Sequence, residues 1–137
     1  MVGKYGTIWM RFMEEKYQFY GKHLIAEGYG IEKEKLNNLD LFLNIFENGI
    51  EKANVTNCGV MVKKFLPNGI TIVILLAESH ISLHTYPEKN SLFLDIFTCG
   101  KKDPNIIFEE VLNYFSTEIK EGGVKFDIAI FERGKGC

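Results

Sequence analysis

The fold of this chain is decided by residues 58–99, which read CGVMVKKFLPNGITIVILLAESHISLHTYPEKNSLFLDIFTC. Four strand-like runs follow one another here, at residues 58–65, 69–77, 80–85 and 91–99. The first alternates between apolar and polar residues, and the second is rich in β-branched residues. Turn-forming residues separate the runs at 66–69 and 86–90. The stretch therefore predicts an antiparallel-rich sheet.

Helical patterns flank this stretch on both sides. Residues 32–53 carry apolar residues at three- and four-residue steps, which predicts one amphipathic helix: Leu36, Leu39, Phe42, Leu43, Phe46 and Ile50. A second helix begins at Asp103-Pro104, with an acidic cap followed by proline at the first helical position. Its apolar face holds Ile107, Val111, Phe115 and Ile119, and Gly122-Gly123 ends it. Residues 17–29 and 124–131 read as two further strands.

The chain of 137 residues suits one compact domain, with residues 1–16 as an N-terminal extension. We expect an α+β two-layer sandwich with both helices on one face of the sheet. Residues 70–76 are apolar on both sides of their strand, so the other face of the sheet also needs a cover. A second subunit is the simplest cover, and we expect a four-layer homodimer.

Composition narrows the class of protein. The net charge of −2 and pI of about 5.9 give no sign of binding to nucleic acid or to an anionic membrane surface. The longest apolar run is too short to cross a bilayer, and no signal peptide is apparent. Three widely spaced cysteines argue against a disulfide framework and predict a cytoplasmic protein. Cys58 reads as a small core residue and Cys137 as a free terminal thiol.

Residues 77–88, AESHISLHTYPE, are dense in polar groups although they follow a core strand. If residues 80–85 are extended, His80, Ser82 and His84 share one side of the strand. A hairpin around Pro87 would return Cys99 towards Ser79.

Three blocks of this region resemble the small bacterial and archaeal S-adenosylmethionine decarboxylases: Glu78-Ser79-His80, residues 84–88 (HTYPE) and residues 95–100 (DIFTCG). Weaker support comes from residues 21–24 (GKHL) and 132–134 (ERG), so that the resemblance covers most of the chain. These are pyruvoyl enzymes of polyamine synthesis, which supply decarboxylated S-adenosylmethionine for spermidine.

The resemblance implies that the chain is a zymogen that cleaves itself between Glu78 and Ser79, giving chains of residues 1–78 and 79–137. Ser79 would attack the Glu78 carbonyl, and elimination and hydrolysis would convert Ser79 into a covalent pyruvoyl group. His84 matches the processing base, a role that suits an imidazole near neutral pH. Thr71 stands where the family usually has a serine that assists processing.

The resemblance also implies the roles in turnover. The pyruvoyl group would form a Schiff base with the substrate amine and act as an electron sink. Cys99 matches the general acid that reprotonates the α-carbon, and Phe65 and Tyr86 match aromatic positions that sandwich adenine. Glu88 matches the residue that hydrogen-bonds the ribose.

Four alternatives stand beside this interpretation. Residues 89–93, KNSLF, replace the small, glycine-containing turn usual in the family, which keeps open a decarboxylase of ornithine or arginine. A relative that is never cleaved and serves as a binding or regulatory partner is the alternative from another class. His80 and His84 as a metal pair lack further ligands nearby, so we expect no metal. A serine hydrolase lacks its Gly-x-Ser-x-Gly motif.

Overall fold

The computed structural model describes residues 19–116 and 123–134. The extension predicted for residues 1–16, together with Ile119 and Cys137, lies outside the described residues. The strands are β1 (Gly21–Tyr29), β2 (Asn57–Lys64), β3 (Ile70–Leu76), β4 (Ser79–Tyr86), β5 (Ser91–Cys99) and β6 (Lys125–Arg133). The helices are α2 (Lys33–Leu36), α3 (Leu39–Ala53), the 3₁₀ turn η1 (Pro87–Lys89) and α4 (Pro104–Ser116).

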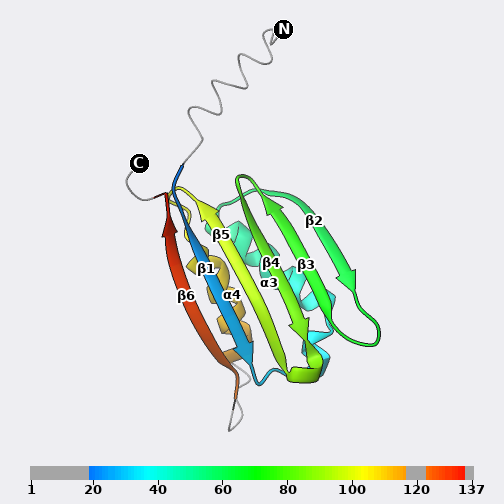
Figure 1. The fold of residues 1–137 in the computed structure, drawn as a ribbon. Coiled ribbons are helices and arrows are strands. Elements are labelled where there is room, and N and C mark those ends of the chain that lie inside the picture. The colour runs from blue at the N-terminus through cyan, green and yellow to red at the C-terminus, as the bar shows by residue number, and fades with distance from the viewer. Residues whose placement is uncertain (1–18, 117–122, 135–137) are drawn as a thin grey trace.

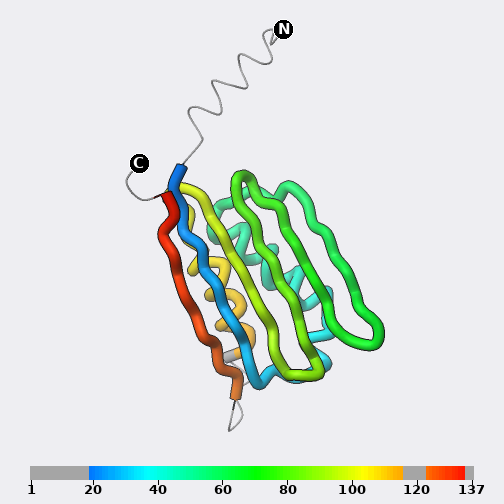
Figure 2. The backbone as a smooth tube through the Cα atoms, in the orientation of Figure 1, coloured from blue at the N-terminus to red at the C-terminus, as the bar shows by residue number. Residues whose placement is uncertain are grey.

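The six strands of the described residues form one sheet in the order β2-β3-β4-β5-β1-β6 (Figure 2). Every neighbouring pair is antiparallel. Consecutive strands β2 to β5 pair through short turns, as the sequence predicts, whereas β1 inserts between β5 and β6. The α+β two-layer sandwich is confirmed, with α3 and α4 covering the same face of the sheet (Figure 1).

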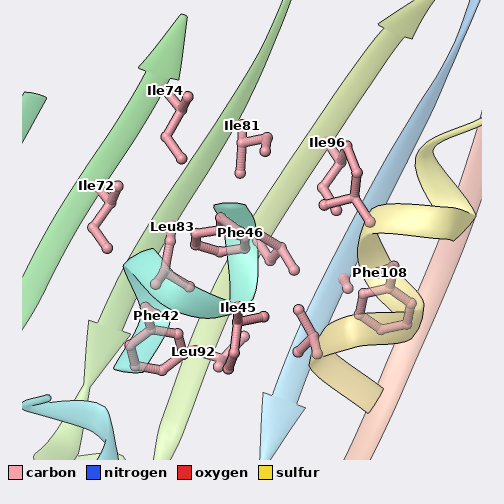
Figure 3. Close-up of a cluster of buried hydrophobic side chains, with 14 of the residues drawn as sticks. Phe42, Ile45, Phe46, Ile72, Ile74, Ile81, Leu83, Leu92, Ile96 and Phe108 are labelled. Carbon is pink, nitrogen blue, oxygen red and sulfur yellow. The ribbon is translucent and has the colours of Figure 1, made fainter. Parts of the chain in front are cut away.

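The core lies between the sheet and the two long helices. Phe42 and Phe46 of α3 face aliphatic side chains of the central strands, and Phe108 of α4 lies beside them (Figure 3). α3 and α4 pack closely because Gly49 presents no side chain: a Cβ atom there would lie 2.9 Å from the Cα of Ile107.

The single helix predicted for residues 32–53 is wrong, because two helices cover this stretch. Asn37 leaves helical geometry at the end of α2, and Asn38 is extended at the start of α3. The Asn38 side chain accepts a hydrogen bond from the backbone N–H of Leu41, 3.1 Å away, and so caps α3. The apolar periodicity continues across the break, because Leu36, Phe42 and Phe46 are all buried.

The sheet face away from α3 and α4, called the open face below, has no cover among the described residues. Strand alternation places Val73 and Leu75 of β3 there, and Ile25 of β1 and Phe93 of β5 share it. All four are exposed large hydrophobic residues. In the described part of the chain, no helix is long and apolar enough to span a membrane.

Candidate active site

The turn between β3 and β4 is strained at one residue. Leu76 and Ser79 are register partners, so Ala77 and Glu78 alone make the turn. Glu78 has a φ angle of 62°, in the left-handed region that residues with a side chain rarely adopt. Strain of this kind gathers at functional sites. The strained residue, Glu78, forms the peptide bond at which the sequence predicts cleavage.

The Ser79 hydroxyl is held in place on two sides. It donates to the carbonyl oxygen of Ala77 at 3.3 Å and accepts from the backbone N–H of Cys99 at 3.1 Å. Ser79 is only 6% exposed, so water competes little for this hydroxyl. The predicted return of Cys99 to Ser79 is therefore confirmed.

Cys99 also contacts the predicted scissile bond. Its thiol donates to the carbonyl oxygen of Glu78, with Sγ and O separated by 2.6 Å. Burial raises the pKa of the Cys99 thiol, the hydrogen bond with Ser79 lowers it, and the charge of Glu78 raises it. The net direction is upward, so the thiol keeps its proton at neutral pH and acts as a donor.

A cavity of about 640 Å³ opens at this end of the sheet. Glu78, Ser79 and Cys99 line it from the strand ends, and the loop after α3 and the residues after β5 supply the rest: Asn54, Val55, Thr56, Ala77, Gly100, Lys101 and Lys102. This volume suits a small-molecule ligand.

His84 and Thr71 form a pair on the open face. The Nδ1 atom of His84 lies 2.8 Å from the Thr71 hydroxyl oxygen, across the register pair of β3 and β4. If Nδ1 carries the proton and donates to Thr71, the Nε2 atom of His84 keeps the lone pair that a base needs. His84 follows Ser79 by five residues in one strand, which separates them by about 16 Å. Within one chain the structure does not bring these residues together.

The three predicted substrate-binding residues lie at the same end as His84. Phe65 follows β2, Tyr86 ends β4 and Glu88 lies in η1. Phe65 and Glu88 are exposed, and the Tyr86 ring contacts Phe93, with 5.0 Å between centroids. The predicted site residues therefore form two groups at opposite ends of β4. We call Glu78, Ser79 and Cys99 the cleavage group, and Phe65, Thr71, His84, Tyr86 and Glu88 the distal group.

Between the two groups lies a polar cluster, of which the sequence predicts only that His80 and Ser82 share one side of β4. The Nε2 atom of His23 lies 3.4 Å from Asp95 Oδ1, and the Ser82 hydroxyl donates to Asp95 Oδ2 at 3.3 Å. His23, His80 and Phe97 form a triangle of rings with centroids 5.7–6.0 Å apart. Strand alternation puts all of these on the open face, which is the signal that could have grouped them.

The guanidinium of Arg133 also reaches this cluster, 5.3 Å from the Phe97 ring centroid. Burial lowers the pKa of His80, and the charges of His23 and Arg133 lower it further against the opposing effect of Asp95. Among residues 19–116 and 123–134, no three histidine, cysteine or acidic side chains gather closely enough to hold a metal ion.

A family model and individual relatives of known name all indicate the same family for this chain. The family model described as S-adenosylmethionine decarboxylase matches residues 22–122. The chain is 34% identical over 114 residues to an S-adenosylmethionine decarboxylase proenzyme of Aquifex aeolicus, covering 83% of this chain and 81% of that one. A proenzyme of the same name from Archaeoglobus fulgidus is 45% identical over 80 residues, covering 58% of this chain and 71% of its own length.

A solved structure agrees with the sequence matches. The crystal structure of the adenosylmethionine decarboxylase from Aquifex aeolicus matches with a TM-score of 0.72 at 28% identity, covering 85% of this chain and 92% of that one. The family match spans most of the chain, and the fold agrees over nearly all of the solved relative. The chain therefore belongs to the S-adenosylmethionine decarboxylase family and is an enzyme of the decarboxylase class.

Proposed function

We propose that the chain is a proenzyme that cleaves itself between Glu78 and Ser79 and then decarboxylates S-adenosylmethionine with the pyruvoyl group derived from Ser79. Its product would be decarboxylated S-adenosylmethionine for polyamine synthesis. The contact of the Cys99 thiol with the Glu78 carbonyl oxygen at 2.6 Å carries this proposal, because it places a proton donor on the carbonyl that Ser79 must attack.

The residues of the cleavage group suit an acyl shift. The Ser79 oxygen adds to the carbonyl carbon of Glu78, and the thiol of Cys99 stabilises the negative charge that develops on the carbonyl oxygen. The carbon–nitrogen bond breaks as the nitrogen takes a proton, leaving an ester. Removal of the Cα proton of residue 79 expels the Glu78 carboxylate, and hydrolysis with loss of ammonia gives the pyruvoyl group. The left-handed φ angle of Glu78 raises the free energy of the uncleaved peptide and so favours its conversion to the ester.

The base that removes the Cα proton of residue 79 has to come from outside the cleavage group. His84 of the same chain lies about 16 Å along β4 from Ser79, which is beyond any hydrogen bond. His80 directly follows Ser79, but it packs against His23 and Phe97 in the polar cluster. A second copy of the chain that covers the open face in the opposite direction would bring its own His84 and Thr71 over the end of β4 that carries Ser79.

The exposed apolar side chains of the open face support this dimer. Val73, Leu75 and Ile25 face water in a single chain, and a second sheet packed on them would bury them. Each active site would then combine the cleavage group of one protomer with the distal group of its partner.

The distal group suits a nucleoside. β2 and β4 lie on either side of β3, so about 10 Å separates the ends that carry Phe65 and Tyr86. A flat base stacked between two rings needs a gap of this order. The exposed carboxylate of Glu88 is placed beyond Tyr86, where it can accept hydrogen bonds from ribose hydroxyls.

The pyruvoyl group would supply an electron sink for the carbanion left by loss of carbon dioxide. Cys99 lies beside residue 79 in the intact chain, and its protonated thiol would deliver a proton to the substrate carbon. The cavity beside Ser79 and Cys99 has room for the amino-acid part of the substrate.

Ornithine or arginine as substrate has no supporting observation. In residues 89–93, Leu92 is fully buried in the core and Ser91 is also buried, so neither side chain is exposed to a ligand in a single chain. Asn90 binds the backbone of Ile31 through its side chain at 2.9 Å. Only Lys89 and Phe93 are left exposed, and the relatives described above are named for S-adenosylmethionine.

Two measurements test the proposal. Intact-protein mass spectrometry should find chains of residues 1–78 and 79–137, the latter lighter by one ammonia than a chain beginning with serine. Carbon dioxide release should follow S-adenosylmethionine and not ornithine or arginine, assayed in parallel. A Ser79→Ala variant should stay whole and inactive. A wild-type protein that stays uncleaved, or cleavage of Ser79→Ala, would overturn the proposal.

A further inference from the structure

Self-cleavage would leave a new carboxylate at the centre of the active site. In the intact chain the carbonyl oxygen of Glu78 lies 2.6 Å from the Cys99 thiol. The proposed elimination turns this carbonyl into the terminal carboxylate of the first chain. We infer that Lys101 and Lys102 bind this carboxylate and so draw it away from Cys99 before decarboxylation begins. This inference rests on the self-cleavage proposed above.

A terminal carboxylate that stayed beside Cys99 would oppose the second reaction in two ways. The thiol would keep donating to that carboxylate instead of to the substrate carbon. The added negative charge would raise the pKa of the thiol further, as the charge of the Glu78 side chain already does. The substrate also carries a carboxylate, which a like charge at this place would repel. The new chain end therefore has to leave Cys99 for turnover to proceed.

The backbone at Glu78 favours this movement. Its φ angle of 62° is strained, and cleavage breaks the peptide bond that holds this angle. The preceding residue, Ala77, is held in place, because its backbone N–H donates to the carbonyl oxygen of Thr56 at 3.0 Å. The movement is therefore confined to Glu78, which turns about its bond to Ala77.

The cavity beside the cleavage group contains two cations that can bind the new chain end. Glu78, Lys101 and Lys102 all line this cavity. Among the described residues, neither lysine has an ion-pair partner. The acidic residue of the same loop, Asp103, is already engaged, because it accepts the backbone N–H and the side-chain amide of Asn105 at 2.9 and 3.0 Å. The two ammonium groups are therefore left for another anion.

Hydrogen bonds hold the loop that carries the two lysines against the active site. The buried Thr98 hydroxyl donates to the carbonyl oxygen of Lys102 at 2.8 Å. The backbone N–H of Lys102 donates to the carbonyl oxygen of Cys99 at 3.4 Å. Both lysines thus begin within one turn of Cys99. Their flexible side chains can bring an ammonium group to the chain end at Glu78.

A carbodiimide, which joins a carboxylate to an amine only where the two are in contact, tests this binding directly. In the cleaved protein it should link residue 78 to Lys101 or Lys102. The link joins the chains of residues 1–78 and 79–137 with loss of one water, and peptide mass spectrometry locates it. Cleaved chains without this link, or with residue 78 linked only to a different lysine, overturn the inference.

The link has to involve the terminal carboxylate and not the side chain of Glu78. Glu78→Gln removes the side-chain carboxylate and keeps the terminal one, so the link should persist in this variant. If this variant does not cleave, fragment ions of the wild-type linked peptide distinguish the two carboxylates. A link through the side-chain carboxylate alone overturns the inference.

Variants that remove the two charges add a readout in turnover. Lys101→Met combined with Lys102→Met should cleave at the wild-type rate, because the terminal carboxylate does not exist before cleavage. Its kcat/KM for S-adenosylmethionine should fall about fivefold. Arginine at both positions keeps the charges and should keep kcat/KM. Lys33→Met, exposed on α2, is the control and should match the wild type. Slower cleavage of the methionine pair, or an unchanged kcat/KM, contradicts the inference.

The same samples separate this inference from the proposed function. Mass spectrometry reports cleavage and carbon dioxide release reports turnover, independently of the cross-link. A wild-type chain that stays whole contradicts the proposed function. Cleaved, active chains in which residue 78 is not linked to either lysine contradict the inference alone.

Discussion

The thiol of Cys99, the last residue of β5, and the carbonyl oxygen of Glu78, the turn residue before β4, form a hydrogen bond of 2.6 Å. The backbone N–H of the same cysteine binds the Ser79 hydroxyl at 3.1 Å. One residue therefore contacts both the electrophile and the nucleophile of the proposed cleavage. This arrangement gives Cys99 a part in self-cleavage as well as in turnover.

Replacing Cys99 with alanine should slow self-cleavage without abolishing it. The backbone N–H that holds Ser79 remains, but the donor to the Glu78 oxygen is lost, and one such hydrogen bond corresponds to a rate change of about tenfold. Decarboxylation by the cleaved chains should fall much further. Mass spectrometry over time after dilution from denaturant measures the cleavage. Cys99→Ser, which keeps a donor, is the matched control, and cleavage of Cys99→Ala at the wild-type rate would contradict this role.

Mixing two inactive variants should restore cleavage in one of them. His84→Ala chains should stay uncleaved alone because the proposed base is missing, and Ser79→Ala chains cannot be cleaved at all. In a mixed dimer, Ser79 of the first chain meets His84 of the second. After co-expression in equal amounts, about half of the His84→Ala chains should be cleaved.

Intact-protein mass spectrometry distinguishes the two variants by mass. A mixture that forms dimers but leaves every His84→Ala chain whole excludes His84 as a base acting between protomers. Cleavage of His84→Ala alone excludes it as the base.

Replacing Phe65 with alanine should weaken substrate binding and leave self-cleavage unchanged. Phe65 follows β2 in the distal group, its ring is half exposed, and it lies at the opposite end of the sheet from the cleavage group of its own chain. Loss of one stacked aromatic ring costs about 1 kcal/mol, which corresponds to a rise in KM of roughly fivefold to tenfold. Carbon dioxide release at varied S-adenosylmethionine concentration measures this. Leu66→Ala, which removes a neighbouring exposed side chain, is the control and should keep the wild-type KM.

The strands and turns of residues 58–99 were predictable because alternation and turn residues are local signals. The proximity of Ser79 and Cys99 followed in the same way, since a short turn around Pro87 aligns β4 with β5. The break at Asn37 and Asn38 was not predicted, because the apolar periodicity runs through it. At this break the Asn38 side chain caps the start of α3, and this local hydrogen bond is favoured over one continuous helix.

The insertion of β1 between β5 and β6 was not predictable from local patterns. It depends on pairing between Gly21–Tyr29 and strands more than sixty residues away. The distance between Ser79 and His84, in contrast, follows from the strand geometry alone, since five residues of extended chain span about 16 Å. Because Ser79 and His84 are close in sequence, they suggested one site. The extended backbone between them instead places them in two separate groups.

Replacing Gly49 with alanine should destabilise the fold although alanine favours helices. The new Cβ atom would lie 2.9 Å from the backbone Cα of Ile107, so α3 and α4 must move apart. Overpacking of this kind costs about 1–3 kcal/mol, against a gain of about 1 kcal/mol in helix propensity. We expect a net loss of about 1 kcal/mol in the free energy of unfolding by urea, measured in the uncleaved Ser79→Ala chain. Asn48→Ala, exposed on the same helix, should be neutral or slightly stabilising. A more stable Gly49→Ala chain would show that the helices separate freely.

Acidification should destabilise the fold through His80. Burial is the largest cause of its lowered pKa, and the positive charges of His23 on β1 and Arg133 on β6 add to it, against Asp95 on β5. At pH values above the usual histidine pKa of 6.5, His80 is neutral in both the folded and the unfolded chain and contributes no pH dependence. Below that value the unfolded chain binds a proton that the folded chain resists, so stability is lost as the pH falls. Thermal unfolding of the Ser79→Ala chain between pH 7.5 and pH 5 measures this, and replacing His80 with phenylalanine should flatten the curve below pH 6.5. Parallel curves for the two chains would assign the acid sensitivity to other groups.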